Sequence, residues 1–183
     1  MSKITVWTKQ NSAIMDALLK TGRHVAKKEY VHKNEDAMSM ITAYDWLVKE
    51  HPDRSNKPSD ADYPIWISTR KDAVMKETTG TVFLELEIEE ELITYLNVDK
   101  WGMINNFSYI PLNKEDEKIH KEKMKAYGIS DVKACMSRFY PELKKEIQDS
   151  WKRVFNEDVK TGNDHAYGLI WEIKKEWVKA CDY

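Results

Sequence analysis

Residues 81–88 alternate so regularly between two kinds of side chain that they leave little choice of secondary structure. Apolar residues stand at every second position, namely Val82, Leu84, Leu86 and Ile88. Successive side chains of a β-strand point to opposite faces, so this spacing predicts a strand with one buried face. The chain therefore needs a sheet and an apolar layer that covers one side of it.

Other stretches repeat their apolar residues with the period of an α-helix. The repeat in 37–48 consists of Ala37, Ile41, Tyr44 and Val48. The repeat in 143–155 consists of Leu143, Ile147, Trp151, Val154 and Phe155, and a shorter stripe consists of Val132, Cys135, Met136 and Phe139. We expect helices there, and we expect Trp151, in the middle of its stripe, to be buried.

Strands and helices are partly segregated along the chain rather than regularly alternating, which favours the α+β class. We predict a single globular domain over residues 1–183, with a central mixed or antiparallel sheet and helices packed against it. The sheet segments expected from composition and alternation are 3–9, 64–70, 81–88 and 166–174. The first and last strands are expected to be neighbours, which would bring Thr8 near Glu172. The segment from Glu29 to His32 is expected to be extended.

Composition excludes several classes of protein. The chain has 183 residues, of which 42% are hydrophobic and 33% charged, so it is neither collagen-like nor largely disordered. No apolar run is long enough to cross a bilayer and no secretory signal is evident, which predicts a cytoplasmic protein without a membrane partner. The net charge of -2 argues against a general nucleic-acid coat. Cys135 and Cys181 are expected to be reduced thiols.

Motifs with a defined chemistry are missing. The sequence contains no phosphate-binding P-loop, no glycine-rich dinucleotide fingerprint, no Gly-x-Ser-x-Gly and no Cys-x-x-Cys. The five histidines show no metal-ligand spacing, although His24 and His32 are eight apart. We therefore predict no metal site.

The best local candidate for an anion site is a basic stretch that follows the first expected helix. It contains Lys20, Arg23, His24, Lys27 and Lys28. Guanidinium and ammonium groups beside a titratable imidazole suit a phosphate or RNA contact. A solvated surface loop explains the same charges, and both interpretations stay open at this point.

Several short motifs, in order along most of the chain, resemble a family of functionally uncharacterised bacterial and phage domains. They are Trp7-Thr8-x-Gln10, Tyr44-Asp45-Trp46-Leu47, Tyr63-Pro64-Ile65-Trp66, Ser150-Trp151-x-Arg153-Val154-Phe155 and Trp171-Glu172-Ile173. The family usually has a Gln at the start of its last long strand, where this chain has Asp164-His165-Ala166-Tyr167. The resemblance implies no activity by itself.

A second, more distant resemblance is to ADP-ribosyltransferase-like domains. It is carried by Trp7-Thr8, by Leu19-Lys20-Thr21-Gly22, by Tyr30 and by Glu172. The resemblance implies that NAD is used and that Thr8 holds the nicotinamide amide while Tyr30 or a Trp stacks on the ring. It also implies a catalytic carboxylate, Glu172 first and Asp164 second. The residues implied for NAD binding are Trp7, Arg23, His24 and Lys27.

Three functions compete. One is an ADP-ribosyltransferase-like enzyme that uses NAD to act on a protein or a nucleic acid. The alternative is a phage or mobile-element counter-defence protein of the anti-CRISPR type, whose partner is a host protein or protein–RNA complex. It would inhibit that complex by binding, or by acting on the guide RNA with His24 or His32. The third is a structural or regulatory module without a site. Seven Trp and nine Tyr suit the binding function, because aromatic anchors dominate interface energetics.

Overall fold

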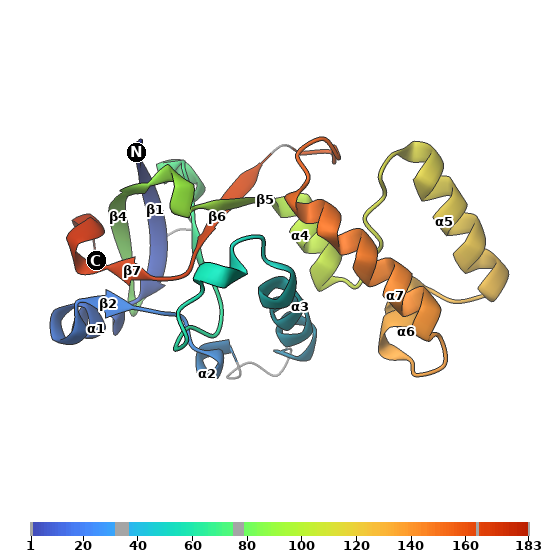
Figure 1. Ribbon diagram of the computed structural model, residues 1–183, viewed down its shortest axis with the longest axis horizontal. Helices are drawn as coiled ribbons and strands as arrows, with labels where there is room; N and C mark the ends of the chain where they lie inside the picture. Colours follow the sequence, from blue (N-terminus) through green and yellow to red (C-terminus); the bar gives the residue numbers. More distant parts are fainter. Residues whose placement is uncertain (1, 32–36, 75–78, 164, 183) are drawn as a thin grey trace. The chain divides into compact units, whose positions relative to one another are not determined.

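The computed structural model describes residues 2–31, 37–74, 79–163 and 165–182. The chain forms two units, which are described separately (Figure 1). Unit 1 consists of Met1–Glu35, Tyr44–Tyr95 and Tyr167–Tyr183, and unit 2 consists of Asp36–Ala43 and Leu96–Ala166. Unit 1 is thus assembled from three pieces of chain, and most of unit 2 lies between the second and the third. The prediction of a single domain over 1–183 stays a prediction.

The main sheet of unit 1 is antiparallel and has the strand order β1-β4-β8. Figure 1 labels β1 and β4 of this sheet. Its strands are β1 (Lys3–Asn11), β4 (Thr81–Glu89) and β8 (Val178–Asp182). The alternation over 81–88 is confirmed as a strand, and its four apolar side chains are at most 1% exposed. Because β4 lies between β1 and β8, the first and last strands are not neighbours, contrary to expectation.

The remaining strands form two smaller sheets. One pairs β2 (Arg23–His24) with β7 (Ile173–Lys174), and the other has the order β3-β6-β5. The members of the second are β3 (Ile65–Ile67), β5 (Thr94–Asn97) and β6 (Ala166–Ile170). The α+β class is confirmed, with the predicted strand segments distributed over several antiparallel sheets.

In its described part, unit 1 contains two short α-helices and the second half of a longer one, from Tyr44 on. In α1 (Ile14–Thr21) the side chains of Ile14 and Leu18 are buried, and Gly22 ends the helix in the left-handed conformation with φ 75°. The expectation of an extended segment from Glu29 is wrong, because Lys28–Val31 form the short helix α2. Its first backbone N–H, that of Lys28, donates to the carboxylate of Asp62, which suits the positive end of a helix. The predicted helix at 37–48 is confirmed as α3 (Ala37–Glu50).

Unit 2 is built from helices. They are α4 (Val98–Asn105), α5 (Lys114–Tyr127), α6 (Asp131–Met136), α7 (Pro141–Ser150) and the 3-10 segment η4 (Trp151–Phe155). The burial predicted for Trp151 is confirmed, since its side chain is 0% exposed. Of the shorter stripe only Cys135 is buried, while Val132, Met136 and Phe139 are exposed.

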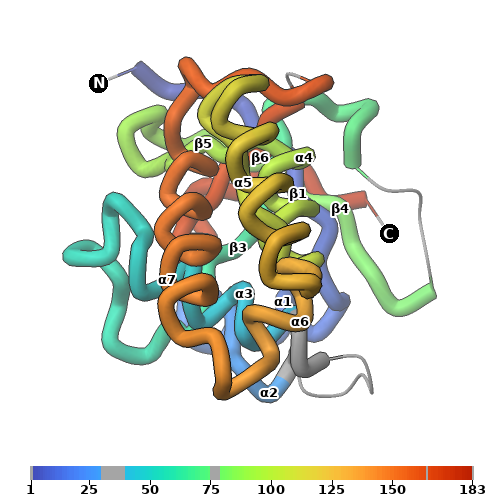
Figure 2. Tube along the Cα trace, turned by 90° about the vertical axis from the view of Figure 1, so that its right-hand side faces the viewer, coloured from blue at the N-terminus to red at the C-terminus, as the bar shows by residue number. Residues whose placement is uncertain are grey.

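Polar contacts help to hold α5 to the rest of unit 2, since most of its residues are charged. The buried His120 lies 2.9 Å from Asp131 at the start of α6, and its ring stacks on Tyr109 with centroids 3.9 Å apart. Lys123 forms an ion pair with Glu146 of α7, and Figure 2 shows these two helices. None of the helices in the described part of the chain is long and apolar enough to cross a membrane.

Candidate functional site

Thr8 stands at the start of a hydrogen-bonded network in unit 1. Its side chain faces the buried side of β1, where it is 2% exposed. The hydroxyl group donates to the carbonyl of Trp66 over 2.7 Å and accepts from the Gln10 amide over 2.8 Å. Trp7 faces the other side of the strand and donates from its indole to Glu85. Thr8 is therefore a residue that positions Trp66.

Trp66 continues the network to two tyrosines. Its indole nitrogen donates to the Tyr44 hydroxyl over 2.7 Å, and the Tyr44 ring lies 4.9 Å from the ring of Tyr63. The Tyr63 hydroxyl donates to Asp45 over 2.8 Å, and Lys28 lies 3.3 Å from both oxygens of that carboxylate. We call Lys28, Tyr44, Asp45, Tyr63 and Trp66 the aromatic–acid cluster.

Both phenol groups of this cluster stay protonated at neutral pH. Burial raises the pKa of Tyr63, and the neighbouring Asp45 carboxylate raises it further. Burial also raises the pKa of Tyr44, against the smaller lowering effect of the hydrogen bond from Trp66. The two hydroxyls therefore act as hydrogen-bond groups and not as bases.

A second group of charges surrounds Arg23. The pairing of β2 with β7 brings Arg23 opposite Lys174 and His24 opposite Ile173. The Nε of Arg23 then lies 2.8 Å from the Glu172 carboxylate, which is also 3.6 Å from the Lys174 ammonium. Glu172 itself lies in the short connection between β6 and β7, directly after the bend at Trp171.

The other edge of the Arg23 guanidinium contacts both oxygens of Asp60, over 3.1 and 3.3 Å. Lys27 donates to the backbone carbonyl of the same Asp60. We call Arg23, Lys27, Asp60, Glu172 and Lys174 the Arg23 cluster. Three cations in it face two carboxylates, so the cluster has an excess positive charge.

Two pKa shifts describe the charge state around Arg23. Partial desolvation raises the pKa of Asp60, but the hydrogen bonds and charges of Arg23 and Lys27 outweigh it, so that pKa lies below its ordinary value. Burial lowers the pKa of His24, so its imidazole is neutral at physiological pH. The positive charge thus comes from Arg23 and the lysines.

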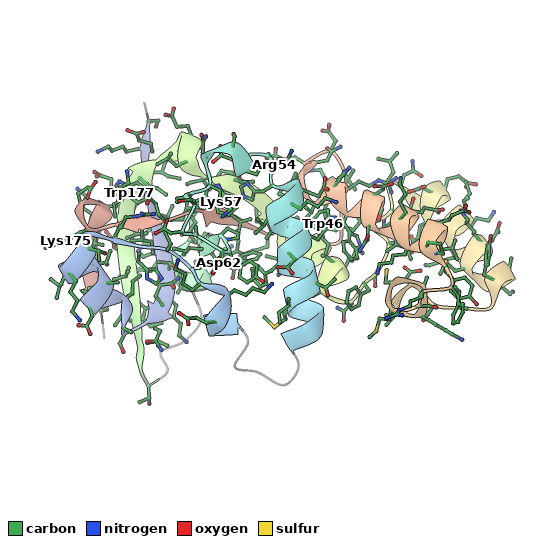
Figure 3. All side chains as sticks on the ribbon, turned by 60° about the horizontal axis from the view of Figure 1, so that its bottom comes forward. Trp46, Arg54, Lys57, Asp62, Lys175 and Trp177 are labelled. Carbon is green, nitrogen blue, oxygen red and sulfur yellow. The ribbon has the colours of Figure 1, made fainter. Side chains whose placement is uncertain are left out.

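The two clusters share the same two stretches of chain. Ala26 and Tyr63 form an antiparallel bridge, and the backbone N–H of Asp62 donates to the Ala26 carbonyl over 3.0 Å. Residues 23–28 therefore run beside residues 60–63. We take both clusters together as one candidate site on unit 1. Figure 3 shows the side chains of this unit, with Asp62 labelled on the second stretch.

Unit 2 offers a different candidate, a pocket of about 370 Å³ that is lined among others by Tyr109, Lys145, Glu146, Asp149 and Arg153. Its charges are balanced within the helices: Lys145 pairs with Asp149 over 2.7 Å, and Glu146 pairs with Lys123. The excess positive charge of the Arg23 cluster makes unit 1 the stronger candidate.

The predicted site residues fall into three groups. Arg23, Lys27 and Glu172 come together, with His24 next to them in β2. Thr8 and Trp7 lie on β1, where their side chains form hydrogen bonds with Trp66, Gln10 and Glu85. Tyr30 belongs to α2, and its side chain lies outside the described part of the structure, as does Asp164.

Sequence reasoning missed the role of several residues. Asp60 follows Pro58 and Ser59, and nothing in this stretch of sequence marks it as a partner for Arg23. Tyr44, Asp45, Tyr63 and Trp66 were noticed only as parts of the motifs that carried the family resemblance. Those motifs were a usable signal, because the structure joins three of them through Thr8, Trp66 and Tyr44. Within the described residues, no group of three or more His, Cys, Asp or Glu could hold a metal ion.

The motifs that carried the family resemblance run from Trp7 to Ile173, and a comparison with known families covers the same range. A family described as a domain of unknown function (DUF3841) matches residues 5–179. The chain belongs to this DUF3841 family. The match includes Thr8, both clusters of the candidate site and the whole of α7. No curated protein and no solved structure matches the chain.

Proposed function

We propose that this DUF3841 domain is an ADP-ribosyltransferase-like enzyme that uses NAD to modify a protein or a nucleic acid. The observation that supports it best is the contact of Arg23 with Glu172, which are 149 residues apart. A guanidinium group binds a pyrophosphate through paired hydrogen bonds. A carboxylate held next to it is suited to stabilise positive charge that develops on the ribose.

In the proposed reaction the bond between nicotinamide and C1′ of the ribose breaks, and nicotinamide leaves with the electron pair. A nucleophile of the target then bonds to C1′ and releases its proton to water. Glu172 stabilises the oxocarbenium-like centre, Arg23 and Lys27 hold the pyrophosphate, and the rings of Trp66 and Tyr44 offer a stacking surface. Because the Thr8 hydroxyl donates to the backbone carbonyl of Trp66, Thr8 acts by fixing the backbone that carries this ring.

Nicotinamide release from NAD tests this proposal. We expect Glu172→Gln to lower kcat by about 100-fold or more, as removal of one transition-state charge contact does, with an unchanged melting temperature. Glu176→Gln is the matched control, since Glu176 is an exposed glutamate of the neighbouring 3-10 segment η5 (Lys175–Trp177). Equal turnover of the two variants would refute the role of Glu172.

A second candidate function is counter-defence by a phage or mobile-element protein that inhibits a host nucleoprotein complex of the CRISPR type. The observation that favours it is an apolar surface at the end of α6. Val132, Met136 and Phe139 are 42%, 67% and 88% exposed, and the first two are four residues apart on one helix face. Exposed apolar groups of this kind are typical of protein-binding surfaces.

An assay of DNA cleavage by a CRISPR effector separates the two candidates. If the protein acts by binding, the double variant Met136→Ser, Phe139→Ser loses inhibition and Glu172→Gln keeps it. Gel electrophoresis of the guide RNA after incubation shows whether the RNA is cut or modified. Inhibition that is equal in wild type and in the double variant would exclude this surface as the contact.

A further inference from the structure

The guanidinium group of Arg23 contacts two carboxylates, and these differ in how far they are exposed to solvent. Glu172 contacts the Nε edge, and its side chain is 21% exposed, in the short connection between β6 and β7. Asp60 takes the other edge and is 50% exposed. Ion pairs at exposed positions contribute little free energy, so the contact with Asp60 is the one that a ligand displaces more easily.

The loop that carries Asp60 keeps its shape without this contact. Lys57 donates to the backbone carbonyls of Pro58 and Ala61 inside the loop, and Figure 3 labels Lys57 there. The Asp62 carboxylate accepts from the Lys28 backbone N–H over 2.8 Å, which anchors the end of the loop. Release of Asp60 from Arg23 therefore requires rotation of one side chain only.

Displacement of Asp60 would expose donors without acceptors. Its carboxylate occupies the Nη1 and Nη2 edge of Arg23, and rotation of the side chain frees that edge, while the Lys27 ammonium keeps its bond to the Asp60 backbone carbonyl beside it. Both groups are cationic, and the guanidinium edge matches two oxygens of one phosphate as well as it matches a carboxylate. Lys174 adds a third positive charge close to Glu172.

We propose that Asp60 is a built-in competitor of a pyrophosphate group: in the free protein it occupies the guanidinium edge that the ligand takes when it binds. The ligand class is a pyrophosphate, either free or inside a dinucleotide. The inference rests on the proposed function, which supplies such a ligand. It adds that the ligand must compete with Asp60 for Arg23. Binding exchanges the Asp60 side chain for a phosphate at Arg23, while Glu172 keeps its place.

Calorimetric titration of the full chain with inorganic pyrophosphate, and separately with NAD, tests the competition. We expect Asp60→Asn to bind pyrophosphate about two- to fivefold more tightly than wild type, which is the range for loss of one exposed ion pair. We expect Arg23→Gln to bind it at least about tenfold more weakly, because charge-assisted hydrogen bonds are lost. Pyrophosphate alone could bind weakly to every variant. If the affinities for NAD then rank the variants in the expected order, with Asp60→Asn the tightest and Arg23→Gln the weakest, the ligand is the dinucleotide.

The matched controls are Asp72→Asn and Arg70→Gln. Arg70 and Asp72 form an exposed ion pair in the same unit, with N–O distances of 2.6 and 3.1 Å, and we assign them no ligand. Both variants should bind as wild type does. An Asp60→Asn affinity equal to or weaker than wild type would overturn the competition, and so would absence of binding in every variant.

The outcome is separable from that of the proposed function. Tighter pyrophosphate binding by Asp60→Asn without any release of nicotinamide from NAD would keep this inference and refute the enzyme. Nicotinamide release that depends on Glu172, with no effect of Asp60→Asn on the affinity for either ligand, would keep the enzyme and refute this inference.

Discussion

The hydroxyl group of Tyr44 accepts a 2.7 Å hydrogen bond from the indole nitrogen of Trp66. The two residues come from α3 and β3, and this contact joins the helix to the strand inside the aromatic–acid cluster. Tyr44→Phe removes the acceptor and leaves the donor unsatisfied. We expect the free energy of unfolding, measured by urea denaturation, to fall by about 1–3 kcal/mol. Tyr127→Phe, in an exposed tyrosine of α5, is the control and should be neutral.

We expect Trp151 to contribute more to the stability of unit 2 than any other single side chain. Its side chain is 0% exposed, and its indole donates to the carbonyl of Ser108 over 2.8 Å. Trp151→Ala should lower the free energy of unfolding by about 3–5 kcal/mol. Phe139→Ala, which removes an exposed ring, should change it by less than about 0.5 kcal/mol. A loss below about 1 kcal/mol for Trp151→Ala would contradict its role in the core.

Two glycine-to-alanine substitutions should change the free energy of unfolding in opposite directions. A Cβ at Gly168 in β6 would lie 2.6 Å from Ile93 and 2.8 Å from Ile67, so Gly168→Ala should destabilise the protein by about 1–3 kcal/mol. A Cβ at Gly102 in α4 meets no atom within 4 Å, and the helix gains from the restricted backbone. Gly102→Ala should therefore stabilise it by about 0.5–1 kcal/mol. Thermal denaturation of both variants gives the signs directly.

His51 should make the protein sensitive to acid. Burial lowers its pKa from 6.5 to about 4, against a smaller opposite effect of Asp53. Above pH 6.5 the imidazole is neutral in both states, and below this pH the unfolded chain binds the proton first. Stability is therefore lost as the pH falls from 6.5 to about 4, by on the order of 3 kcal/mol in total.

His51→Phe tests this, since it keeps a ring beside Trp171, whose centroid is 4.5 Å away, and removes the titration. The free energy of unfolding, measured between pH 7 and pH 4, should fall less steeply in the variant than in wild type. Parallel pH curves for the two proteins would assign the acid sensitivity to other groups.

The regular elements could be predicted because their signals are local. The alternation in 81–88 reports one buried face of one strand, and the repeat in 143–155 reports one buried face of a helix. The bend after β6 was missed for the same reason. Leu169, Ile170 and Trp171 are all buried, so both faces are covered there and alternation no longer distinguishes strand from bend.

The candidate site could be predicted only in part. The cations of residues 23–28 were visible as a charge cluster, but their partners depend on tertiary structure. Glu172 reaches Arg23 because β2 pairs with β7, and Asp60 does so because residues 60–63 run beside residues 23–28. A two-residue strand and an irregular loop leave no periodic pattern in a sequence, so neither contact could be derived from it.

The three-piece construction of unit 1 has a consequence for synthesis of the chain on the ribosome. β1 and β4 are translated early, whereas β8, which pairs with the other edge of β4, follows only after unit 2. At ordinary rates of elongation the intervening residues take on the order of ten seconds, and during that time one edge of β4 has no strand to pair with. An uncovered edge is a site for wrong pairing or for chaperone binding. The nascent polypeptide should therefore depend on chaperones most strongly in the interval before its final strand emerges.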